Sequence, residues 1–280
     1  MGLPERPRAV ITGAGSGLGR ALCLELGRRG GRMVVSDVNE AEARETVRRV
    51  GLTGGEAHAV ACDVTKAEQV EALALEAERL LGGVDLVVNN AGVAAGGEVG
   101  RLPLTEWKRV LDVNLWGVIH GCHGFVPLLR RQGGGHVLNI ASAAGLMSAP
   151  YMGAYCASKA AVVAISETLL AEVRHLGIGV SVVCPTFFRT NIAGGPAPSG
   201  DAEAQQLHAT AARLVNDARL GPEEIARACL EGVERGEFYI VPMASGRWLW
   251  RLKRLAPELF AQGSHLLTKF VRSRTRHARR

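Results

Sequence analysis

The sequence lacks any apolar run of the roughly eighteen residues that a membrane-spanning helix needs. Its first ten residues, MGLPERPRAV, also lack the apolar core of a secretory signal, which favours a cytoplasmic protein. Aromatic residues make up only 5% of the chain, but apolar residues reach 47%, which is ample for a buried core. No internal repeat or low-complexity linker divides the first 242 residues, which argues for a single domain.

Cysteine occurs six times, but no pair has the C-x-x-C spacing that is typical of metal and redox sites. Most of the six fall in apolar runs, which predicts buried free thiols in a reducing compartment and no disulfides. We likewise expect no metal site. The six are Cys23, Cys62, Cys122, Cys156, Cys184 and Cys229.

The net charge of +6 is unevenly distributed along the 280 residues. Residues 247–280 contain ten Lys or Arg and one acid, Glu258, and the remainder contains 23 basic and 26 acidic residues. The basic character therefore belongs to the C-terminal segment.

Apolar runs alternate with helical patterns along most of the chain. Continuously apolar strands that alternate with helices are typical of a parallel sheet covered on both faces. We therefore predict a doubly wound, Rossmann-type α/β domain over residues 1–246 and a basic amphipathic helical tail over 247–280. The predicted strands cover 8–12, 31–37, 56–63, 84–92, 135–142, 179–185 and 238–242. The predicted helices include one capped by Asn39, one over 66–81, one capped by Thr105 and one that carries Tyr155.

A glycine-rich motif joins the first predicted strand to the first helix. Glycines allow backbone N–H groups and a helix N-terminus to approach a pyrophosphate closely. The motif is Thr12-Gly13-x-x-x-Gly17-x-Gly19, and Leu18 stands where the common G-x-G-x-x-G pattern has its last glycine.

Asp37 ends the second predicted strand. A carboxylate there accepts hydrogen bonds from the ribose hydroxyls of NAD and repels the 2′-phosphate of NADP. Neither Ser16 nor Val38 supplies a cation for such a phosphate. The sequence therefore favours NAD over NADP, although a helix-capping role for Asp37 is an alternative.

Tyr155 and Lys159 are spaced to lie one turn apart on the same face of a helix, and Ser142 precedes the tyrosine by thirteen residues. An ammonium group beside a phenol favours the phenolate, so we expect Lys159 to lower the pKa of Tyr155 from about 10. Lowering it to neutral pH requires about 4 kcal/mol of differential stabilisation. An isolated Tyr-x-x-x-Lys usually has only a structural role, so the other motifs in the chain decide whether this pair is catalytic.

Together, these motifs resemble the short-chain dehydrogenase/reductase family over about residues 8–242. The resemblance implies a catalytic tetrad in which Tyr155 exchanges a proton with the substrate oxygen and Ser142 positions that oxygen. It implies that Lys159 also bonds the nicotinamide ribose, and that Asn114 holds a water that links Lys159 to solvent. The motifs in chain order are TGAGSGLG, Asp63-Val64, NNAG, Asn114, Ser142, Tyr155-x-x-x-Lys159 and Pro185.

The same resemblance implies a set of cofactor-binding residues. The family usually has Pro-Gly after the sixth strand, whereas Thr186 follows Pro185 here. The implied set is Thr12, Gly13, Ser16, Gly17, Leu18, Gly19, Asp37, Asp63, Val64, Asn90, Ala91, Gly92, Tyr155, Lys159, Pro185 and Thr190.

The residues expected beside the catalytic strand ends are mostly apolar, which favours a hydrophobic secondary alcohol or ketone as substrate. Arg189 is the one local cation that argues otherwise. Phe187, Phe188 and Ile192, with the loop GGPAPSG, are predicted to begin a lid. The expected lining comprises Ala94, Ala95, Met147, Pro150, Tyr151 and Met152.

The tail repeats Trp248, Leu252, Leu255 and Leu259 at helical spacing among basic residues. We expect this helix to pack on the domain or on a partner subunit, and contact with an anionic membrane surface is the alternative. No nucleic-acid-binding motif accompanies the charge, so no nucleic-acid partner is expected.

The predicted function is hydride transfer between NAD(H) and an apolar small-molecule alcohol or ketone. An NADPH-dependent carbonyl reductase is one alternative, and a non-catalytic NAD-binding scaffold recruited through the tail is another. Family resemblance further implies a homodimer or homotetramer.

Overall fold

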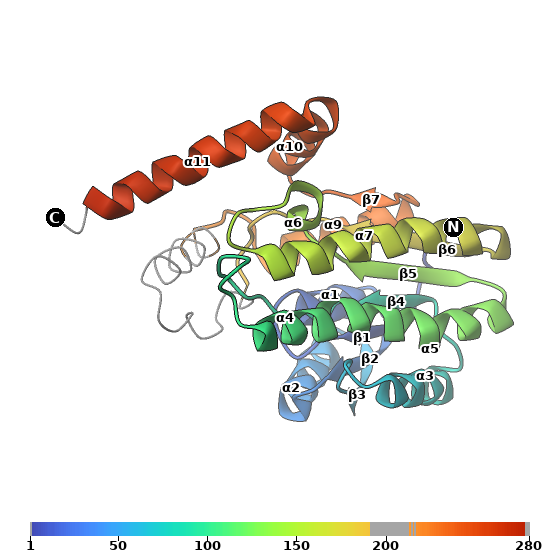
Figure 1. The fold of residues 1–280 in the computed structure, drawn as a ribbon. Helices are drawn as coiled ribbons and strands as arrows, with labels where there is room; N and C mark the ends of the chain where they lie inside the picture. The colour runs from blue at the N-terminus through green and yellow to red at the C-terminus, as the bar shows by residue number, and fades with distance from the viewer. Residues whose placement is uncertain (1, 191–212, 214, 216, 278–280) are drawn as a thin grey trace.

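The computed structural model describes residues 2–190, 213, 215 and 217–277. Within these residues, seven strands form one parallel sheet in the order β3-β2-β1-β4-β5-β6-β7 (Figure 1). The strands are β1 (Arg8–Thr12), β2 (Arg32–Asp37), β3 (Glu56–Ala61), β4 (Leu86–Asn89), β5 (Gly135–Ile140), β6 (Ile178–Val183) and β7 (Tyr239–Ile240).

Helices cover both faces of the sheet and bury a core on each (Figure 1). One face is covered by α1 (Gly17–Arg28), α2 (Glu40–Gly51) and α9 (Pro222–Glu234). The other is covered by α3 (Ala67–Leu81), α5 (Gly117–Gln132) and α7 (Gly153–Val173). The predicted doubly wound fold is therefore confirmed.

The order of the strands fixes where a ligand can bind. β1 pairs with β2 on one side and with β4 on the other, so the chain reverses its direction of progress through the sheet between these neighbours. In open parallel sheets, ligands bind at the carboxyl ends of the strands that flank such a reversal. The glycine-rich turn after β1 lies at this point.

Local sequence explains where α2 and α4 begin. The Asn39 side chain accepts a hydrogen bond from the backbone N–H of Glu42 at 3.3 Å, as expected for the cap of α2. The predicted cap at Thr105 is wrong, because α4 (Leu104–Leu111) already begins after Pro103. Proline fixes its own backbone in an extended conformation here and has no N–H to leave unpaired, which makes it suitable beside a helix start.

The helix that begins with α4 changes its hydrogen-bonding pattern midway. A π-helical segment, η1 (Asp112–Trp116), separates α4 from α5, and Asn114 lies in its middle. Such segments insert one residue into a helix and are frequent at functional sites.

The tail forms two helices, α10 (Ala244–Leu255) and α11 (Pro257–His277). The expected domain boundary after residue 246 falls in the first turn of α10. Gly246 is buried, and the Trp250 ring lies 4.7 Å from that of Tyr239, so α10 contacts the domain. Among the described residues, no helix has the length and apolar character needed to cross a membrane.

Candidate active site

The glycine-rich turn adopts a backbone that only glycine accommodates well. Gly13 and Gly17 have φ angles of 61° and 52°. A Cβ atom at residue 19 would lie 2.3 Å from the carbonyl oxygen of Gly13, so a side chain there would break the turn. A Cβ atom at residue 17 would lie 3.5 Å from the Thr190 hydroxyl oxygen. The turn and Thr190 therefore face each other.

Asn90 holds the turn against the end of β4. Its side-chain amide donates to the carbonyl oxygens of Thr12 at 2.8 Å and Gly13 at 3.0 Å. The Thr12 hydroxyl in turn accepts from the backbone N–H of Asn90 at 3.1 Å and donates to Val88 O at 3.3 Å. These contacts give Thr12 and Asn90 a positioning role within the turn.

Asp37 lies at the carboxyl end of β2, beside the same turn. Its carboxylate accepts hydrogen bonds from the backbone N–H groups of Gly15, at 2.8 Å, and Asn39, at 2.9 Å. Arg20 is nearby in α1, but its guanidinium is bound to Glu42 at 2.6 Å and to Thr46 at 2.9 Å. The Asp37 carboxylate therefore lies beside the glycine-rich turn, and the Arg20 guanidinium is bound to Glu42, Thr46 and the carbonyl oxygen of Gly15.

Ser142 follows β5 and caps the short helix α6 (Ala143–Met147). Its hydroxyl oxygen accepts from the backbone N–H of Ala144 at 3.1 Å. The Ser142 side chain also forms a hydrogen bond with Tyr155, which lowers the pKa of the phenol. The sequence-predicted pair of Ser142 and Tyr155 is thus brought into contact.

Tyr155 and Lys159 lie in the first two turns of α7, and both are buried. The Lys159 ammonium nitrogen is 5.8 Å from the centre of the Tyr155 ring. It donates to the carbonyl oxygen of Ile140, at the end of β5, at 2.7 Å. That bond ties the lysine to the strand whose extension carries Ser142.

The electrostatics of this pair differ from the expectation. Burial raises the pKa of Tyr155 to about 12, and the hydrogen bond from Ser142 offsets this only in part. Burial also lowers the pKa of Lys159 to about 8. Desolvation therefore outweighs the attraction between ammonium and phenolate that the sequence suggested.

Asn114 is fully buried, which excludes the alternative of a solvated surface side chain. Its amide oxygen accepts from the backbone N–H of Val93 at 2.8 Å, and its amide nitrogen donates to Val93 O at 2.9 Å and to the Ser158 hydroxyl at 3.1 Å. The side chain therefore fixes the segment after β4 against α7.

The other expected cofactor residues lie around the same edge of the sheet. A Cβ atom on Gly92 would be 3.6 Å from the Lys159 nitrogen, so the NNAG segment passes beside the lysine. Asp63 accepts from the backbone N–H of Thr65 at 2.9 Å, and Pro185 O accepts from the backbone N–H of Ala143 at 2.9 Å.

Leu18 is the exception among the expected cofactor residues, because its side chain is buried in the core and leaves only its backbone for a ligand. Val64, Ala91 and Ser16 complete the set, of which Ser16 stands at the N-cap position of α1 without a capping hydrogen bond from its side chain.

Two groups that support the site were not foreseen. The Ser158 hydroxyl accepts from Asn114 and donates to Tyr155 O at 2.7 Å, which links the buried amide to the tyrosine backbone. The Ile140 carbonyl oxygen is the acceptor for Lys159. A lone serine and a backbone carbonyl carry no pattern in the sequence that distinguishes them, so no signal pointed to either.

The segment between α6 and α7 holds two non-glycine residues in the left-handed region, Ser148 (φ 58°) and Tyr151 (φ 63°). The carbonyl oxygen of Tyr151 accepts from Gly97 N at 2.7 Å, and Gly97 also forms a bridge with Met152. Strained backbone of this kind is frequent next to functional sites. The contacts bring the segments around Ala95 and Tyr151 together, as the expected substrate lining requires.

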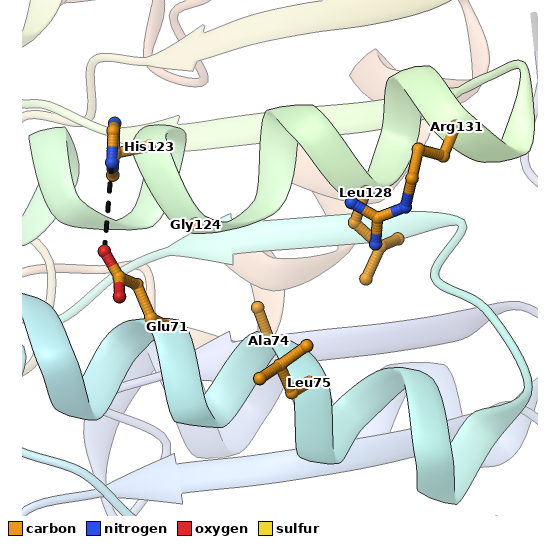
Figure 2. A pocket seen from close by; sticks show the side chains of 7 residues that line it. All are labelled: Glu71, Ala74, Leu75, His123, Gly124, Leu128 and Arg131. Carbon is orange, nitrogen blue, oxygen red and sulfur yellow. Dashed lines mark ion pairs between the residues drawn. The ribbon is translucent and has the colours of Figure 1, made fainter.

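A separate depression lies between α3 and α5, away from these residues. Figure 2 shows its lining, in which His123 of α5 faces Glu71 of α3 with 3.8 Å between the ring nitrogen and the carboxylate oxygen. None of the expected catalytic side chains lines it. The lid expected to begin at Phe187 includes Ile192 and GGPAPSG, which lie outside the described residues.

Comparisons with known proteins agree with this architecture. The family model for short chain dehydrogenase matches residues 7–197. EphD of Mycobacterium tuberculosis, whose name describes it as an oxidoreductase, is 35% identical over 91% of this chain, which spans 44% of the length of EphD. The 3beta-hydroxysteroid dehydrogenase 1 of Eggerthella lenta is 38% identical over 78% of this chain and 83% of its own length.

A solved structure is also similar throughout. A short chain dehydrogenase/reductase from Burkholderia phymatum, crystallised in complex with NAD, is 36% identical with a TM-score of 0.86, over 91% of this chain and 95% of its own.

A doubly wound sheet with a Tyr–Lys–Ser cluster beside a glycine-rich turn defines a dinucleotide-dependent oxidoreductase class of site. The chain belongs to the short-chain dehydrogenase/reductase family.

Proposed function

We propose that this protein transfers a hydride between NAD(H) and a hydrophobic secondary alcohol or ketone, with Tyr155 as general acid and base. The convergence of Ser142, Tyr155 and Lys159 at the carboxyl end of β5, next to the glycine-rich turn, carries the proposal. The turn would hold the pyrophosphate and the serine would hold the substrate oxygen.

The residues present fit NAD. The space between Gly17 and Thr190 would be narrowed by any side chain on the glycine, as a close approach of backbone to pyrophosphate requires. The Asp37 carboxylate at the end of β2 suits a ribose with two free hydroxyls and repels a phosphate. These two observations support NAD over NADP. The nicotinamide ring, when bound, accepts or donates the hydride.

Tyr155 would exchange the proton. With its pKa raised to about 12 by burial, the phenol is protonated at neutral pH and is ready to donate to the oxygen of a ketone. In the oxidation direction, the phenolate form must be reached before it can take the hydroxyl proton of an alcohol. Lys159 would favour that form through its charge, to which the oxidised cofactor adds a second positive charge.

Lys159 has a second role in this proposal. Its hydrogen bond to Ile140 O directs the ammonium group toward the end of β5, next to Gly92. From there it can bond the nicotinamide ribose as well as act on Tyr155. With its pKa lowered to about 8, the lysine is still mostly charged at neutral pH.

Asn114 would contribute through its backbone more than through its side chain. Its amide group is already committed to Val93 and Ser158. The π-helical segment changes the regular hydrogen-bonding pattern of the helix around it, which would free a backbone carbonyl oxygen for a water near Lys159. We therefore assign the proposed water link to the backbone of η1.

The substrate side supports an apolar molecule. The expected lining residues are aliphatic, methionine or tyrosine side chains, and Arg189 does not counter this. Its guanidinium donates to Ala218 O at 3.2 Å and Arg219 O at 3.5 Å, so it is engaged with the chain before α9. A carboxylate or phosphate on the substrate would therefore lack an obvious counter-charge among the described lining residues.

An oligomer is part of the proposal. α7 is largely apolar, and Ala157, Ala160 and Ala164 are exposed along one face of it. An apolar helix that is not fully covered usually packs against another element, and small residues allow a second helix to approach closely. This face supports a homodimer or homotetramer.

The test of the function is a reduced-cofactor absorbance assay. Purified protein is combined with NAD or NADP and a panel of apolar secondary alcohols, and with NADH or NADPH and the matching ketones. We expect turnover with the non-phosphorylated cofactor. Turnover with NADP(H) alone would favour the NADPH-dependent reductase, and tight NAD binding without turnover across the panel would favour the non-catalytic alternative.

The role of Tyr155 is tested by Tyr155→Phe, which removes only the hydroxyl. We expect turnover to fall by at least about a hundredfold, because general acid–base catalysis contributes on that order. NAD affinity, measured by calorimetry, should stay within a few-fold of that of the parent protein. Tyr239→Phe in β7 is the matched control, since its hydroxyl bonds Glu167 away from the turn. Equal loss of turnover in both variants would contradict the assignment.

A further inference from the structure

α10 presents apolar side chains to solvent and a lysine to the protein body. Trp248, Leu252 and Leu255 lie within about 60° of one another around the helix axis, and they are 71%, 45% and 85% exposed. Packing on the domain therefore does not account for this side of the helix.

The opposite side of α10 is firmly attached. Gly246 is buried against Thr186 and Val241, where a Cβ atom would approach to 2.9 Å and 3.3 Å. The centre of the Trp250 ring lies 4.7 Å from that of Tyr239, with the two rings tilted by 50°, and the Lys253 ammonium donates to the carbonyl oxygen of Leu146 at 2.8 Å. These contacts fix the rotation of the helix about its axis, so the outward direction of the apolar side chains is a property of the fold.

α11 also carries exposed apolar side chains. It extends from α10 away from the sheet (Figure 1), and Leu259 and Leu266 are seven residues apart on it, 62% and 64% exposed. We name the set Trp248, Leu252, Leu255, Leu259 and Leu266 the tail surface.

Basic side chains flank the tail surface. Arg251 lies over the Trp248 ring of the tail surface, 6.0 Å from its centre. Residues 247–280 carry ten basic residues against the single acid Glu258. An occupant of this surface must therefore be apolar at its centre and negatively charged at its rim.

We propose that the tail surface docks on an anionic lipid bilayer. Tryptophan and leucine suit the boundary between headgroups and acyl chains, and arginine suits the phosphate and carboxylate groups above it. A second copy of this chain is a poorer occupant, because pairing the tails would bring two strongly positive segments together. The proposal is independent of the proposed function, since it concerns only where the protein resides.

The test is co-sedimentation of the full chain with lipid vesicles. Phosphatidylcholine vesicles that contain about one third phosphatidylserine supply the anionic surface, and pure phosphatidylcholine vesicles are the neutral comparison. We expect binding to the anionic vesicles to be at least about tenfold stronger than to the neutral ones and to weaken as salt is raised.

Two variants identify the surface. Trp248→Glu combined with Leu252→Glu should reduce binding to anionic vesicles by at least about tenfold, because it places acids where the apolar contact forms. Leu104→Glu, which changes a side chain 83% exposed on α4, is the matched control and should bind like the parent protein. Thermal melting checks that all variants are folded, as expected for exposed positions.

Several results would overturn the proposal. They are absence of binding to anionic vesicles, equal binding to neutral ones, and unchanged binding by the double variant. If the parent protein ignores vesicles and the double variant forms a smaller oligomer in light scattering, the tail surface is a subunit interface. If the parent protein ignores vesicles but binds an acidic protein, the occupant of the tail surface is a protein.

Discussion

Two opposing effects act on the proton of Tyr155. The buried position of the ring raises the pKa of the phenol, and the Ser142 hydrogen bond lowers it. Lys159 lies one turn away from Tyr155, but its ammonium group donates a hydrogen bond to Ile140 O. Under the proposed function, the protonated phenol would donate to a ketone oxygen, and bound oxidised cofactor would supply part of the positive charge that favours the phenolate in the reverse direction.

The spacing of residues could predict this cluster but not its energetics. Ser142, Tyr155 and Lys159 are separated by fixed distances along one strand end and one helix, so their meeting follows from local geometry. The balance between desolvation and charge depends on how many apolar atoms of distant segments surround them. Such packing is not encoded in any short motif, and the support from Ser158 was missed for the same reason.

At the residue scale, the cofactor preference is expected to depend on the charge of Asp37. Asp37→Asn keeps a side-chain oxygen that can accept from Gly15 or Asn39 but removes the charge that repels a 2′-phosphate. We expect the ratio of kcat/KM for NAD to that for NADP to fall by about tenfold or more. Steady-state kinetics with both cofactors measure it.

Glu40→Gln is the control for that substitution. It removes a negative charge three residues further along, from an exposed group whose partner is Arg44. The ratio of kcat/KM for NAD to that for NADP should stay close to the parent value in Glu40→Gln. An unchanged ratio in Asp37→Asn would instead make Asp37 a capping residue, as the alternative interpretation of the sequence held.

At the scale of elements, α5 passes very close to the strand that it covers. A Cβ atom on Gly121 would lie 2.0 Å from the side-chain oxygen of Asn89, which is buried and bonded through its amide nitrogen to Asn139 at 2.8 Å. The glycine is thus required by the approach of helix to strand, and it follows shortly after the π-helical segment that shifts the register of the helix.

Gly121→Ala is therefore expected to destabilise the protein by about 2–3 kcal/mol, because the methyl group forces Asn89 or the helix to move. Gly124→Ala, one turn later, should be neutral or stabilising by up to about 1 kcal/mol, since its Cβ would meet no atom closer than 3.4 Å. Urea denaturation of the two variants gives the difference. Equal stability would mean that the close approach is not rigid.

Regular elements were predictable from the sequence to within a few residues. The apolar runs located all seven strands, although β3 ends at Ala61 and β4 at Asn89, earlier than the runs suggested. The π-helical segment was not predictable from the sequence. It places Asn114 in a buried position, and that position is formed by segments far away along the chain. The outward rotation of α10 was also hidden, since it is set by contacts with Tyr239 and Leu146.

At the scale of the whole molecule, the buried thiols link stability to alkaline pH. Burial raises the pKa of Cys229 to about 12, and the other five thiols shift in the same direction. A raised pKa in the folded state means that the folded protein holds the proton more tightly than the unfolded chain. This stabilisation is complete below the unfolded pKa of about 8.5 and is lost as the pH rises toward the folded value.

Cys229→Ala isolates one of these contributions. The stability advantage of the parent protein over the variant should shrink by about 2 kcal/mol between about pH 8 and pH 10. Urea denaturation under reducing conditions measures it, and the subtraction removes the opposite effect of Lys159, whose lowered pKa adds stability in this range. Val233→Ala, on the same helix, should lower the free energy of unfolding by the same amount at both pH values. A constant advantage for both would contradict thiol titration.

The strand order is the feature of the whole molecule that spacing alone left open. Whether β4 pairs beside β1 or elsewhere is decided by contacts far apart in sequence, such as Ala9 beside Leu86. The alternation of strands and helices narrowed the possibilities to parallel sheets, and the glycine-rich turn indicated which strand end would face the ligand.

The bond between Lys253 and Leu146 connects the tail to the helix that Ser142 caps. Under the bilayer proposal, the mouth of the active site is then held at a fixed height and tilt above the lipid. A water-insoluble substrate would reach it by lateral diffusion in two dimensions, and the rate would follow the mole fraction of substrate in the membrane instead of its bulk concentration. The tail would thus make the substrate concentration in the membrane, and not that in solution, the quantity that determines the rate.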